Sequence, residues 1–407
     1  MKLRHLTSCF LLSISCAYAQ TPGAISPKVK EKAQQLAQKF IITDGHVDLP
    51  FRLKVRRFQL EKEYVGIPIQ TNDGDFDYVR AKKGGLDAPF MSIYIPATYD
   101  APGARGLADS LITMVNWIAK ENNTYFEVAH TPQDVIRIKK SGKIALPMGM
   151  ENGSPISELS QLAEYRKKGI SYITLTHGKD NRIGDSSYDT TRTWKGLSPF
   201  GKQVVQQMTK EGIMIDISHV SDDTFYQVIE MSPVPVIASH SSARKFTPGF
   251  ERNMSDDMIR KIKTNNGVIM VNFGSTFVDG EVAKLRNENQ KKLAAILKEK
   301  NLGLRDPAAK PYIDAFYQTT PNVFADVERV ADHIDHIVAL AGINHVGLGS
   351  DYDGVGDSLP TGLKDVSDYP NLLAVLLNRG YSEKDIEKIC SGNLFRVWNQ
   401  VLDFAKK

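Results

Sequence analysis

A single (β/α)8 barrel of the TIM type is the fold class that this 407-residue sequence predicts. Short runs rich in Ile, Val and Leu recur along the chain with little strict alternation, which is typical of parallel strands buried on both faces. Amphipathic helical patterns lie between these runs, and most of the runs end in polar residues. The composition, 42% hydrophobic and 24% charged, is that of a globular protein, and one barrel can use the whole length.

The N-terminus has the pattern of a secretory signal peptide. A basic "MKLRH" precedes the apolar "LTSCFLLSISCAYA", and Ala17-Tyr18-Ala19 is an A-x-A cleavage site. We therefore expect a signal peptide at 1–19 and one domain at 20–407. The apolar run is too short and too soon interrupted to span a bilayer. Lipid attachment at Cys16 is disfavoured, because the residues before it fit a lipoprotein signal poorly.

Charge and cysteine content exclude other classes of protein. The formal net charge is +4 and no clustered basic stripe with interleaved aromatic residues is found, so nucleic acid is not an expected partner. Of the three cysteines, Cys9 and Cys16 would leave with the signal peptide. The mature chain would keep Cys390 alone, and it therefore cannot form an internal disulfide.

Eight apolar runs are the candidate strands, and each is short and bounded by polar or turn residues. They lie at 40–48, 89–95, 144–151, 172–177, 213–219, 234–240, 268–273 and 345–351. Helices are expected at 104–120, 158–168, 199–211, 221–230, 255–264, 327–341 and 382–390. Two connections, 52–86 after the first strand and 275–322 after the seventh, are too long for simple loops, so we expect insertions over the barrel mouth.

Histidines and acidic residues stand at the ends of six of these candidate strands. In a barrel of this kind the carboxyl ends of all strands meet at one rim, where active sites lie. The residues are His46, Asp48, Glu151, His177, His219, His240 and Asp351. Taken alone, "TDGHVDLP" fits a solvated strand end as well as a metal site, and a single buried histidine is often a satisfied core residue. Packing alone does not account for the whole set.

Mixed imidazole and carboxylate ligands favour zinc or a similar divalent ion. In a strand, residues i and i+2 point to the same face, so His46 and Asp48 are expected to project together. Two ions would account for the number of candidate ligands, with His219 and His240 at the second ion. Glu151 has two acceptor oxygens and could bridge the ions.

A metal pair of this kind would lower the pKa of a shared water, which then becomes a nucleophile near neutral pH. We expect Asp351 to act as general acid and base, with Asp353 as the rival candidate. His177 is expected to stay off the metals and to donate to the oxyanion that forms when a carbonyl is attacked.

Other charged residues have simpler interpretations. Arg252 follows the sixth strand after a loop, and it is either a clamp for a carboxylate or a solvated surface arginine. His333 and His336 lie in a helix at the wrong end of a βα unit, so packing or surface exposure is expected. His345 starts a strand at the opposite face of the barrel, and Asp216 is expected to be buried and hydrogen-bonded rather than catalytic.

These residues stand in motifs that are similar to those of a known family. The motifs are "DGHVDLP", "GMENG", "YITLTH", "DISHVSDDTF", "ASHSSAR", "RNMSDDMIRKI", "VNF" and "HVGLGSDYDGV". In this order they resemble the membrane (renal-type) dipeptidases, the peptidase M19 family of the amidohydrolase superfamily. The likeness runs over 40–398 and is highly specific when the motifs are taken together.

The resemblance implies a barrel of the metal-dependent hydrolase kind that binds two zinc ions and cleaves dipeptides with a metal-bridged hydroxide. Members of the family often accept a C-terminal D-residue, and some open β-lactams. By motif, the site residues match as follows: first-zinc ligands His46 and Asp48, bridging ligand Glu151, second-zinc ligands His219 and His240, acid/base Asp351, carbonyl-contacting His177 and carboxylate-binding Arg252.

Departures from the family pattern bear on specificity and location. Val47 and Asn152 replace the residues usual beside the ligands, and "GKDNRIGDSSYD" after His177 differs from the vertebrate enzymes. The vertebrate lipid-anchor signal and interchain disulfide have no counterpart. We therefore expect a secreted enzyme of the periplasm of a Gram-negative bacterium, with no membrane span and with a homodimer as the family's usual assembly.

Two alternative functions stay open at this point. One is a different hydrolase on the same site, such as an N-acyl amino acid deacylase or a lactonase. The other is a noncatalytic periplasmic metal-binding protein. Retention of every candidate ligand together with Asp351 favours an enzyme.

Overall fold

The computed structural model describes residues 25–55, 69–99, 101–304 and 306–407, and within them eight parallel strands form one sheet that curls into a barrel. The order of the strands in the sheet is β1-β2-β5-β6-β7-β8-β9-β10. The strands are β1 Ile42–Val47, β2 Leu86–Tyr94, β5 Met148–Glu151, β6 Ile170–Thr174, β7 Met214–Asp216, β8 Ile237–Ala238, β9 Val268–Val271 and β10 Val346–Leu348. The predicted fold class is confirmed. The predicted signal peptide, with Cys9 and Cys16, lies outside the described residues.

Backbone hydrogen bonds between the first and last strands close the barrel just beyond the end of β10. The Asp48 N–H donates to the Tyr352 carbonyl over 2.9 Å, and the Asp351 N–H donates to the His46 carbonyl over 3.1 Å. Val47 and Tyr352 form a parallel bridge at the same level. Two candidate site residues, Asp48 and Asp351, are therefore positioned by the closure of the barrel itself.

The predicted third strand, 144–151, is in fact two strands. Its first part, β4 (Ile144–Leu146), pairs with β3 (Phe126–Val128) in a separate two-stranded sheet. Its second part, β5, belongs to the barrel. Pro147 stands between the two parts, and because proline has no N–H it cannot continue a ladder of strand hydrogen bonds. The other predicted strands are present, and all of them except the second, which begins earlier and is longer, are shorter than predicted. Most site residues therefore lie one to three positions past a strand end.

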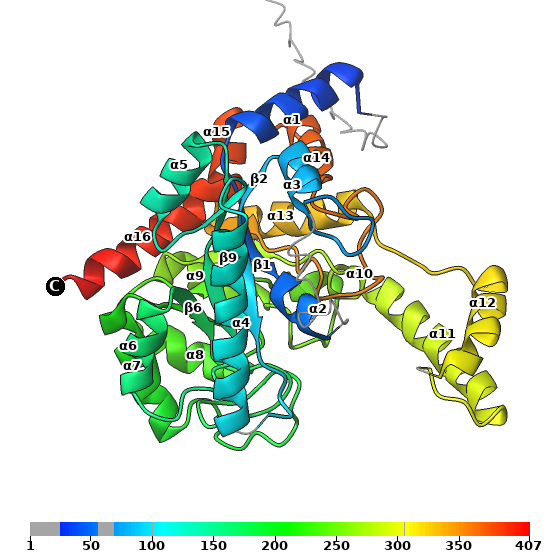
Figure 1. Ribbon diagram of the computed structural model, residues 1–407, viewed down its shortest axis with the longest axis horizontal. Coiled ribbons are helices and arrows are strands. Elements are labelled where there is room, and N and C mark those ends of the chain that lie inside the picture. Colours follow the sequence, from blue (N-terminus) through cyan, green and yellow to red (C-terminus); the bar gives the residue numbers. More distant parts are fainter. Residues whose placement is uncertain (1–24, 56–68, 100, 305) are drawn as a thin grey trace, which may run out of the picture.

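Helices cover the outside of the barrel (Figure 1). Serine caps begin two of the predicted helices, since the Ser221 and Ser255 side chains accept from Thr224 N–H and Met258 N–H. The helices are α1 Pro27–Lys39, α2 Leu49–Val55, α3 Tyr78–Gly84, α4 Ala101–Glu121, α5 Pro132–Lys140, α6 Ser160–Lys167, α7 Pro199–Glu211, α8 Asp222–Met231, α9 Asp256–Asn265, α10 Ser275–Val278, α11 Gly280–Glu299, α12 Lys310–Thr319, α13 Val327–Ala341, α14 Tyr369–Asn378, α15 Glu383–Glu387 and α16 Asn393–Ala405, with short turns η1 Arg244–Phe246, η2 Pro307–Ala309, η3 Ile343–His345 and η4 Lys388–Gly392.

The predicted helix 382–390 is interrupted. It begins with a capping box between Ser382 and Asp385, but after α15 the chain widens into the π-helical turn η4 before α16 starts. The Cys390 carbonyl in this turn accepts a hydrogen bond from the Thr43 hydroxyl of β1 over 2.7 Å. The turn thus joins the last helix to the first strand. Cys390 is buried.

The insertion after the seventh strand lies only partly at the barrel mouth. Its first turn, α10, brings Phe277 to the cavity described below. Helices α11 and α12 project away from the barrel as a hairpin (Figure 1). This hairpin has a small apolar cluster of its own, which includes Leu293, Leu297 and Phe316. The expectation that the whole insertion covers the mouth is therefore corrected.

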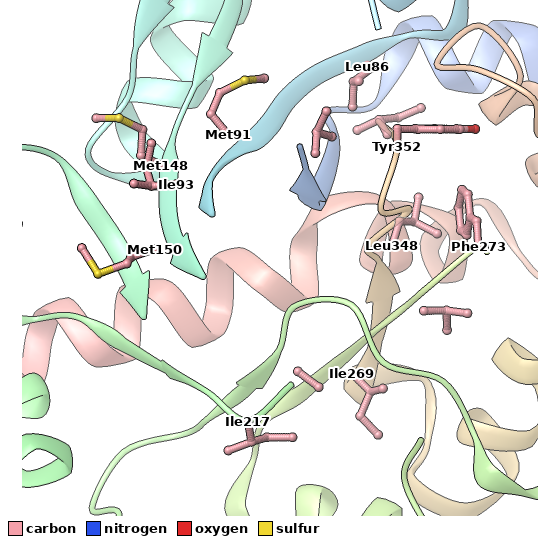
Figure 2. Close-up of a cluster of buried hydrophobic side chains, with 14 of the residues drawn as sticks. Leu86, Met91, Ile93, Met148, Met150, Ile217, Ile269, Phe273, Leu348 and Tyr352 are labelled. Atoms are coloured by element: carbon pink, nitrogen blue, oxygen red, sulfur yellow. The ribbon is translucent and has the colours of Figure 1, made fainter. Parts of the chain in front are cut away.

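Both faces of the strands are buried, and the two faces belong to different parts of the core. Met91 and Ile93 of β2 point outward beside Met148 and Met150 of β5 (Figure 2), where they pack in the layer between sheet and helices. Phe90 points inward and belongs to a second cluster inside the barrel. This double burial is the physical reason for the near-continuous apolar runs in the sequence.

An aromatic column fills the barrel from its lower end to the site. Trp398 of α16 lies 5.2 Å from the Phe90 ring, and Phe90 lies 5.5 Å from the Tyr172 ring, measured between centroids. Gly149 makes room for Tyr172, because a Cβ there would lie 2.0 Å from the ring. The Tyr172 hydroxyl ends the column beneath His46. The core packing and the site are therefore directly connected.

Among the helices of the described residues, none is long and apolar enough to cross a bilayer.

The two helical histidines are structural, as predicted. His333 is fully buried, its Nδ1 accepts from the Ala243 N–H over 2.9 Å, and its Nε2 donates to the Val278 carbonyl over 2.9 Å. His336 pairs with Asp256 nearer the surface. Burial lowers the pKa of His333 from 6.5 to about 4.

This lowered pKa predicts a loss of stability in acid. Between pH 6.5 and pH 4 the unfolded chain binds a proton at His333 that the folded chain does not, so the free energy of unfolding falls as the pH falls. At pH 5 the loss from this residue is about 2 kcal/mol. Urea unfolding at pH 7.5 and pH 5 should show a smaller drop for His333→Gln than for the unsubstituted protein. Equal drops would contradict the assignment.

Candidate metal centre

The Glu151 carboxylate at the end of β5 lies between imidazoles from other strand ends. Its Oε1 is 3.0 Å from His219 Nε2 and 3.2 Å from His240 Nε2. Its Oε2 is 3.3 Å from His46 Nε2. His177 is farther away, with Nε2 3.7 Å from Oε1. The single carboxylate therefore faces one histidine with one oxygen and a pair of histidines with the other, as the predicted bridging arrangement requires.

His46 and Asp48 project to the same side, as the i, i+2 spacing predicts. Asp48 Oδ2 lies 3.4 Å from His46 Nε2. Candidate ligand atoms of His46, Asp48 and Asp351 all lie within 4.8 Å of one another. The His46 and His240 rings stack with centroids 3.8 Å apart, which joins this half of the site to the other half.

The residues fit divalent metal ions. His46 Nε2 and Asp48 Oδ1 are buried, and within the described part of the chain neither atom has a hydrogen-bond partner. Unpartnered buried polar atoms are costly unless another group binds them. Imidazole nitrogens and carboxylate oxygens at this spacing are ligands of zinc and related ions. Two further groups share the carboxylate, one with His46 and His240 and one with His177 and His219.

The electrostatics around Glu151, His219 and His240 favour the protonation states that metal ligands need. Burial, together with the nearby Arg252 guanidinium, lowers the pKa of His219 well below its ordinary value. Burial, with His46 and Arg252, does the same for His240. Burial alone would raise the pKa of Glu151, but the surrounding histidines hold it well below the usual range. This half of the site thus combines the neutral imidazoles of His219 and His240 with an ionised carboxylate. His46 differs, because Tyr172 and the Glu151 and Asp48 carboxylates outweigh its burial and raise its pKa well above the ordinary value.

Asp351 has a pKa suited to proton transfer. Burial and the neighbouring Asp48 raise its pKa to about 7. Its Oδ2 accepts a hydrogen bond from Asn272 Nδ2 over 2.7 Å. Burial raises the pKa of the rival Asp353 to about 7 as well, but Asp353 faces Arg52 on the wall of the cavity, with Arg52 Nε and Asp353 Oδ1 3.0 Å apart. Of the two aspartates, Asp351 is the one among the candidate ligands.

Several site residues adopt left-handed backbone conformations that are unfavourable for side chains other than glycine. The φ angles are 67° at His219, 65° at Asp351 and 76° at Asn152. Such angles cluster at functional sites, where the surrounding structure enforces them. Here all three angles lie in the connections directly after strands β5, β7 and β10.

Arg252 is brought to the site but does not line the cavity. It is buried beside the His219 nitrogen that faces Glu151: its Nη2 lies 2.9 Å from His219 Nε2 and donates to the His240 carbonyl over 2.8 Å. Its Nη1 donates to Ser241 Oγ over 2.6 Å. The interpretation of Arg252 as a solvated surface arginine is therefore wrong. Its role towards a substrate stays a prediction.

A cavity of about 840 Å³ opens over the metal centre. His177 stands at its wall, with its ring 4.7 Å from Tyr94 and 4.4 Å from His219 between centroids. The lining residues are Asp48, Phe51, Arg52, Tyr94, Glu151, His177, Gly178, Tyr188, His219, Phe277, Asp351, Asp353, Gly354 and Val355. Charged residues at the base of the cavity and aromatic residues on its walls suit a small molecule that has both polar groups and side chains.

Sequence reasoning missed several residues of this site. Asn272 follows β9 directly, so the strand-end pattern that found the histidines could have found it as well. Tyr172 lies inside a strand and Gly354 has no side chain, so neither carries such a signal. Arg52, Tyr94 and Tyr188 come from the helix, strand and loop around the rim. Their presence in the cavity depends on tertiary packing.

A parallel barrel whose strand ends gather imidazoles and carboxylates beneath one cavity is the architecture of metal-dependent hydrolases. The sequence profile described as membrane dipeptidase (peptidase family M19) matches residues 30–407. The chain belongs to this family of metallo-dipeptidases, and the resemblance read from the motifs is confirmed.

Known relatives support the assignment over most of the chain. Dipeptidase tcpJ of Claviceps purpurea is 32% identical over 372 residues, which cover 89% of this chain and 77% of that protein. Dipeptidase 3 of Mus musculus is 31% identical over 386 residues, covering 94% and 68%. The crystal structure of the probable dipeptidase PvdM from Pseudomonas aeruginosa superposes with a TM-score of 0.78 at 27% identity, covering 93% of this chain and 100% of that one.

A metallo peptidase from Rhodobacter sphaeroides, solved with a phosphinate mimic of the dipeptide L-Ala-D-Ala, has the same fold. Its TM-score is 0.72 at 22% identity, and the match covers 89% of this chain and 99% of that chain.

Gly354 predicts a sensitive position at the metal centre. A Cβ there would lie 2.2 Å from Asp48 Oδ2 and 2.3 Å from Asp351 Oδ1, so both carboxylates would have to move. We expect Gly354→Ala to weaken metal binding by roughly 100-fold while the fold is kept. Zinc titration against a chelating indicator, with circular dichroism for the fold, measures this.

Gly356→Ala is the matched control on the same loop. A Cβ at Gly356 meets no atom within 4 Å, although its φ of +57° is unfavourable for alanine. It should lose about 1 kcal/mol of stability and bind metal normally. Normal metal binding by Gly354→Ala would show that the carboxylates tolerate displacement.

Proposed function

We propose that the protein is a zinc-dependent dipeptidase with two metal ions per chain. The observation that carries the proposal is the position of Glu151, which presents one oxygen to His46 and the other to His219 and His240. A carboxylate shared in this way suits two ions better than one. Zinc is the metal proposed, because the ligands are imidazoles and carboxylates in a compact, buried arrangement.

The metal ions, when bound, would lower the pKa of a coordinated water so that it can attack a carbonyl at neutral pH. Asp351 lies beside His46 and Asp48 and has a pKa of about 7, so we assign it the transfer of a proton to the leaving amine. Asn272 holds one Asp351 oxygen, which leaves the other directed to the site. His177, at the cavity wall, would stabilise the oxyanion.

Arg252 is proposed to bind the C-terminal carboxylate of the dipeptide. Its Nε is buried, and among the described residues it has no hydrogen-bond partner. A guanidinium close to the second histidine pair would limit the length of the leaving residue, which favours dipeptides over longer chains. The aromatic side chains of Phe51, Tyr94 and Tyr188 would then contact the two substrate side chains.

A C-terminal D-residue is proposed as acceptable. The resemblance to the family supports this, and the Rhodobacter sphaeroides relative was solved with a mimic of L-Ala-D-Ala.

We also propose export to the periplasm through the signal peptide at 1–19, which the mass of the protein recovered from the periplasm would test. A homodimer is proposed on the family likeness and is testable by light scattering.

Substitution of Asp351 tests the mechanism. Asp351→Asn keeps the size of the side chain but cannot take up a proton, so turnover should fall by about 100-fold or more. Metal content, measured by elemental analysis, should stay at the unsubstituted level. Asp357→Asn, at an exposed aspartate on the same loop, is the control and should behave normally. Loss of metal in Asp351→Asn would make Asp351 a ligand instead.

Substrate class and metal dependence are tested together. We expect hydrolysis of an L-D and an L-L dipeptide that is abolished by a chelator and restored by zinc. Bound metal without dipeptide cleavage would favour the alternative activities, N-acyl amino acid deacylase or lactonase, which are assayed directly. Bound metal without any turnover on these substrates would favour a noncatalytic metal-binding protein.

A further inference from the structure

The outer nitrogens of the candidate histidine ligands have three different environments. His240 Nδ1 lies 2.7 Å from Ser239 Oγ, and Ser239 Oγ lies 2.6 Å from Asp216 Oδ2. His46 Nδ1 lies 2.9 Å from the Tyr172 hydroxyl, which donates to the Gly45 carbonyl. Within the described structure, His219 Nδ1 has no hydrogen-bond partner. Of these three histidines, His240 alone is linked through its outer nitrogen, Nδ1, to a second carboxylate.

The direction of the protons in the His240 chain follows from the donors around Asp216. Oδ1 accepts from the backbone N–H of Ser218 over 3.0 Å and of Ser239 over 2.8 Å. Oδ2 accepts from the Ser239 hydroxyl and from the Thr174 hydroxyl over 2.5 Å. Four donors surround a carboxylate that is fully buried, so both of its oxygens act as acceptors.

Because the single hydroxyl proton of Ser239 goes to Asp216, Ser239 Oγ can only accept from His240. The proton of the neutral imidazole is then on Nδ1, and the lone pair of Nε2 faces Glu151, 3.2 Å away. A carboxylate acting through a hydroxyl also makes the imidazole a stronger electron donor. The outer nitrogen of His46 faces the neutral Tyr172 hydroxyl, which is a weaker hydrogen-bond acceptor than a hydroxyl bound to a carboxylate.

We propose that Asp216 and Ser239 are positioning residues that set the tautomer and the donor strength of His240, and so tighten the metal ion held on the side of His219 and His240. The proposal rests on the metal binding in the proposed function and deepens it. Asp216, which the sequence indicated to be buried and hydrogen-bonded, thus acts on the site through its neighbour.

Two substitutions separate this role from a purely structural one. Asp216→Asn keeps the shape but brings an amide donor to the Ser239 hydroxyl, which then donates to His240 Nδ1 and moves the imidazole proton to Nε2. Ser239→Ala leaves Nδ1 without its acceptor. Zinc binding by equilibrium dialysis should show one of the two ions bound 10- to 100-fold more weakly in Ser239→Ala, and more weakly still in Asp216→Asn.

A spectroscopic measurement and a control accompany the dialysis. The visible absorption of the cobalt-substituted protein should change in both variants at a fully loaded site, because the ligand field of His240 changes. Thr43→Val removes a buried hydroxyl that bonds to the Cys390 carbonyl in the same barrel. It should lower the thermal stability of the metal-free protein without changing metal affinity or the cobalt spectrum.

The outcomes are decisive in each direction. Unchanged zinc affinity in both Asp216→Asn and Ser239→Ala would overturn the proposal, as would an equal loss in Thr43→Val. If the unsubstituted protein binds no divalent ion, the proposal and the proposed function both fail. If it binds ions and the variants lose one, but no dipeptide is cleaved, only the proposed activity fails.

Discussion

The burial of the Glu151 carboxylate among imidazoles is the interaction on which the architecture of this site depends. A charged group in a barrel interior is stable only when other groups compensate it. Three histidines within 3.3 Å and the candidate metal ions provide this compensation. The histidine side chains must also be fixed by contacts beneath them, because rotation of their rings would move the nitrogens away from Glu151. The barrel interior supplies the supports, one aromatic and one polar.

The aromatic support is the column of Trp398, Phe90 and Tyr172, which transmits the packing of the last helix to His46. The polar support is the Asp216–Ser239 pair beneath His240. Buried polar networks are favourable only when every member has a partner, and the four donors around Asp216 meet this condition. The positions of His46 and His240 at the rim thus depend on packing and hydrogen bonding in the barrel interior below them.

Agreement between prediction and structure differs from one part of the molecule to another for physical reasons. The apolar runs predicted the barrel, because parallel strands buried on both faces require such runs. Every ligand predicted from the strand ends lies in one site of the structure, because the carboxyl ends of the strands meet at one rim. The apolar pattern was wrong at Pro147, where one predicted strand is two. The search of strand ends considered histidines and acidic residues, so it passed over Asn272, which directly follows β9.

By itself, the sequence determined the fold class, the chemical type of the site and the ligands that local spacing places on one face, such as His46 and Asp48. It also carried the motifs that identify the family. Only the tertiary structure decided that Arg252 is buried against His219 and that Gly354 lies too close to Asp48 and Asp351 for a side chain. It also decided that Asp216 reaches His240 through Ser239. These relations join residues that are distant or differently oriented along the chain. Local periodicity contains no information about them, because they arise from the closure and packing of the barrel.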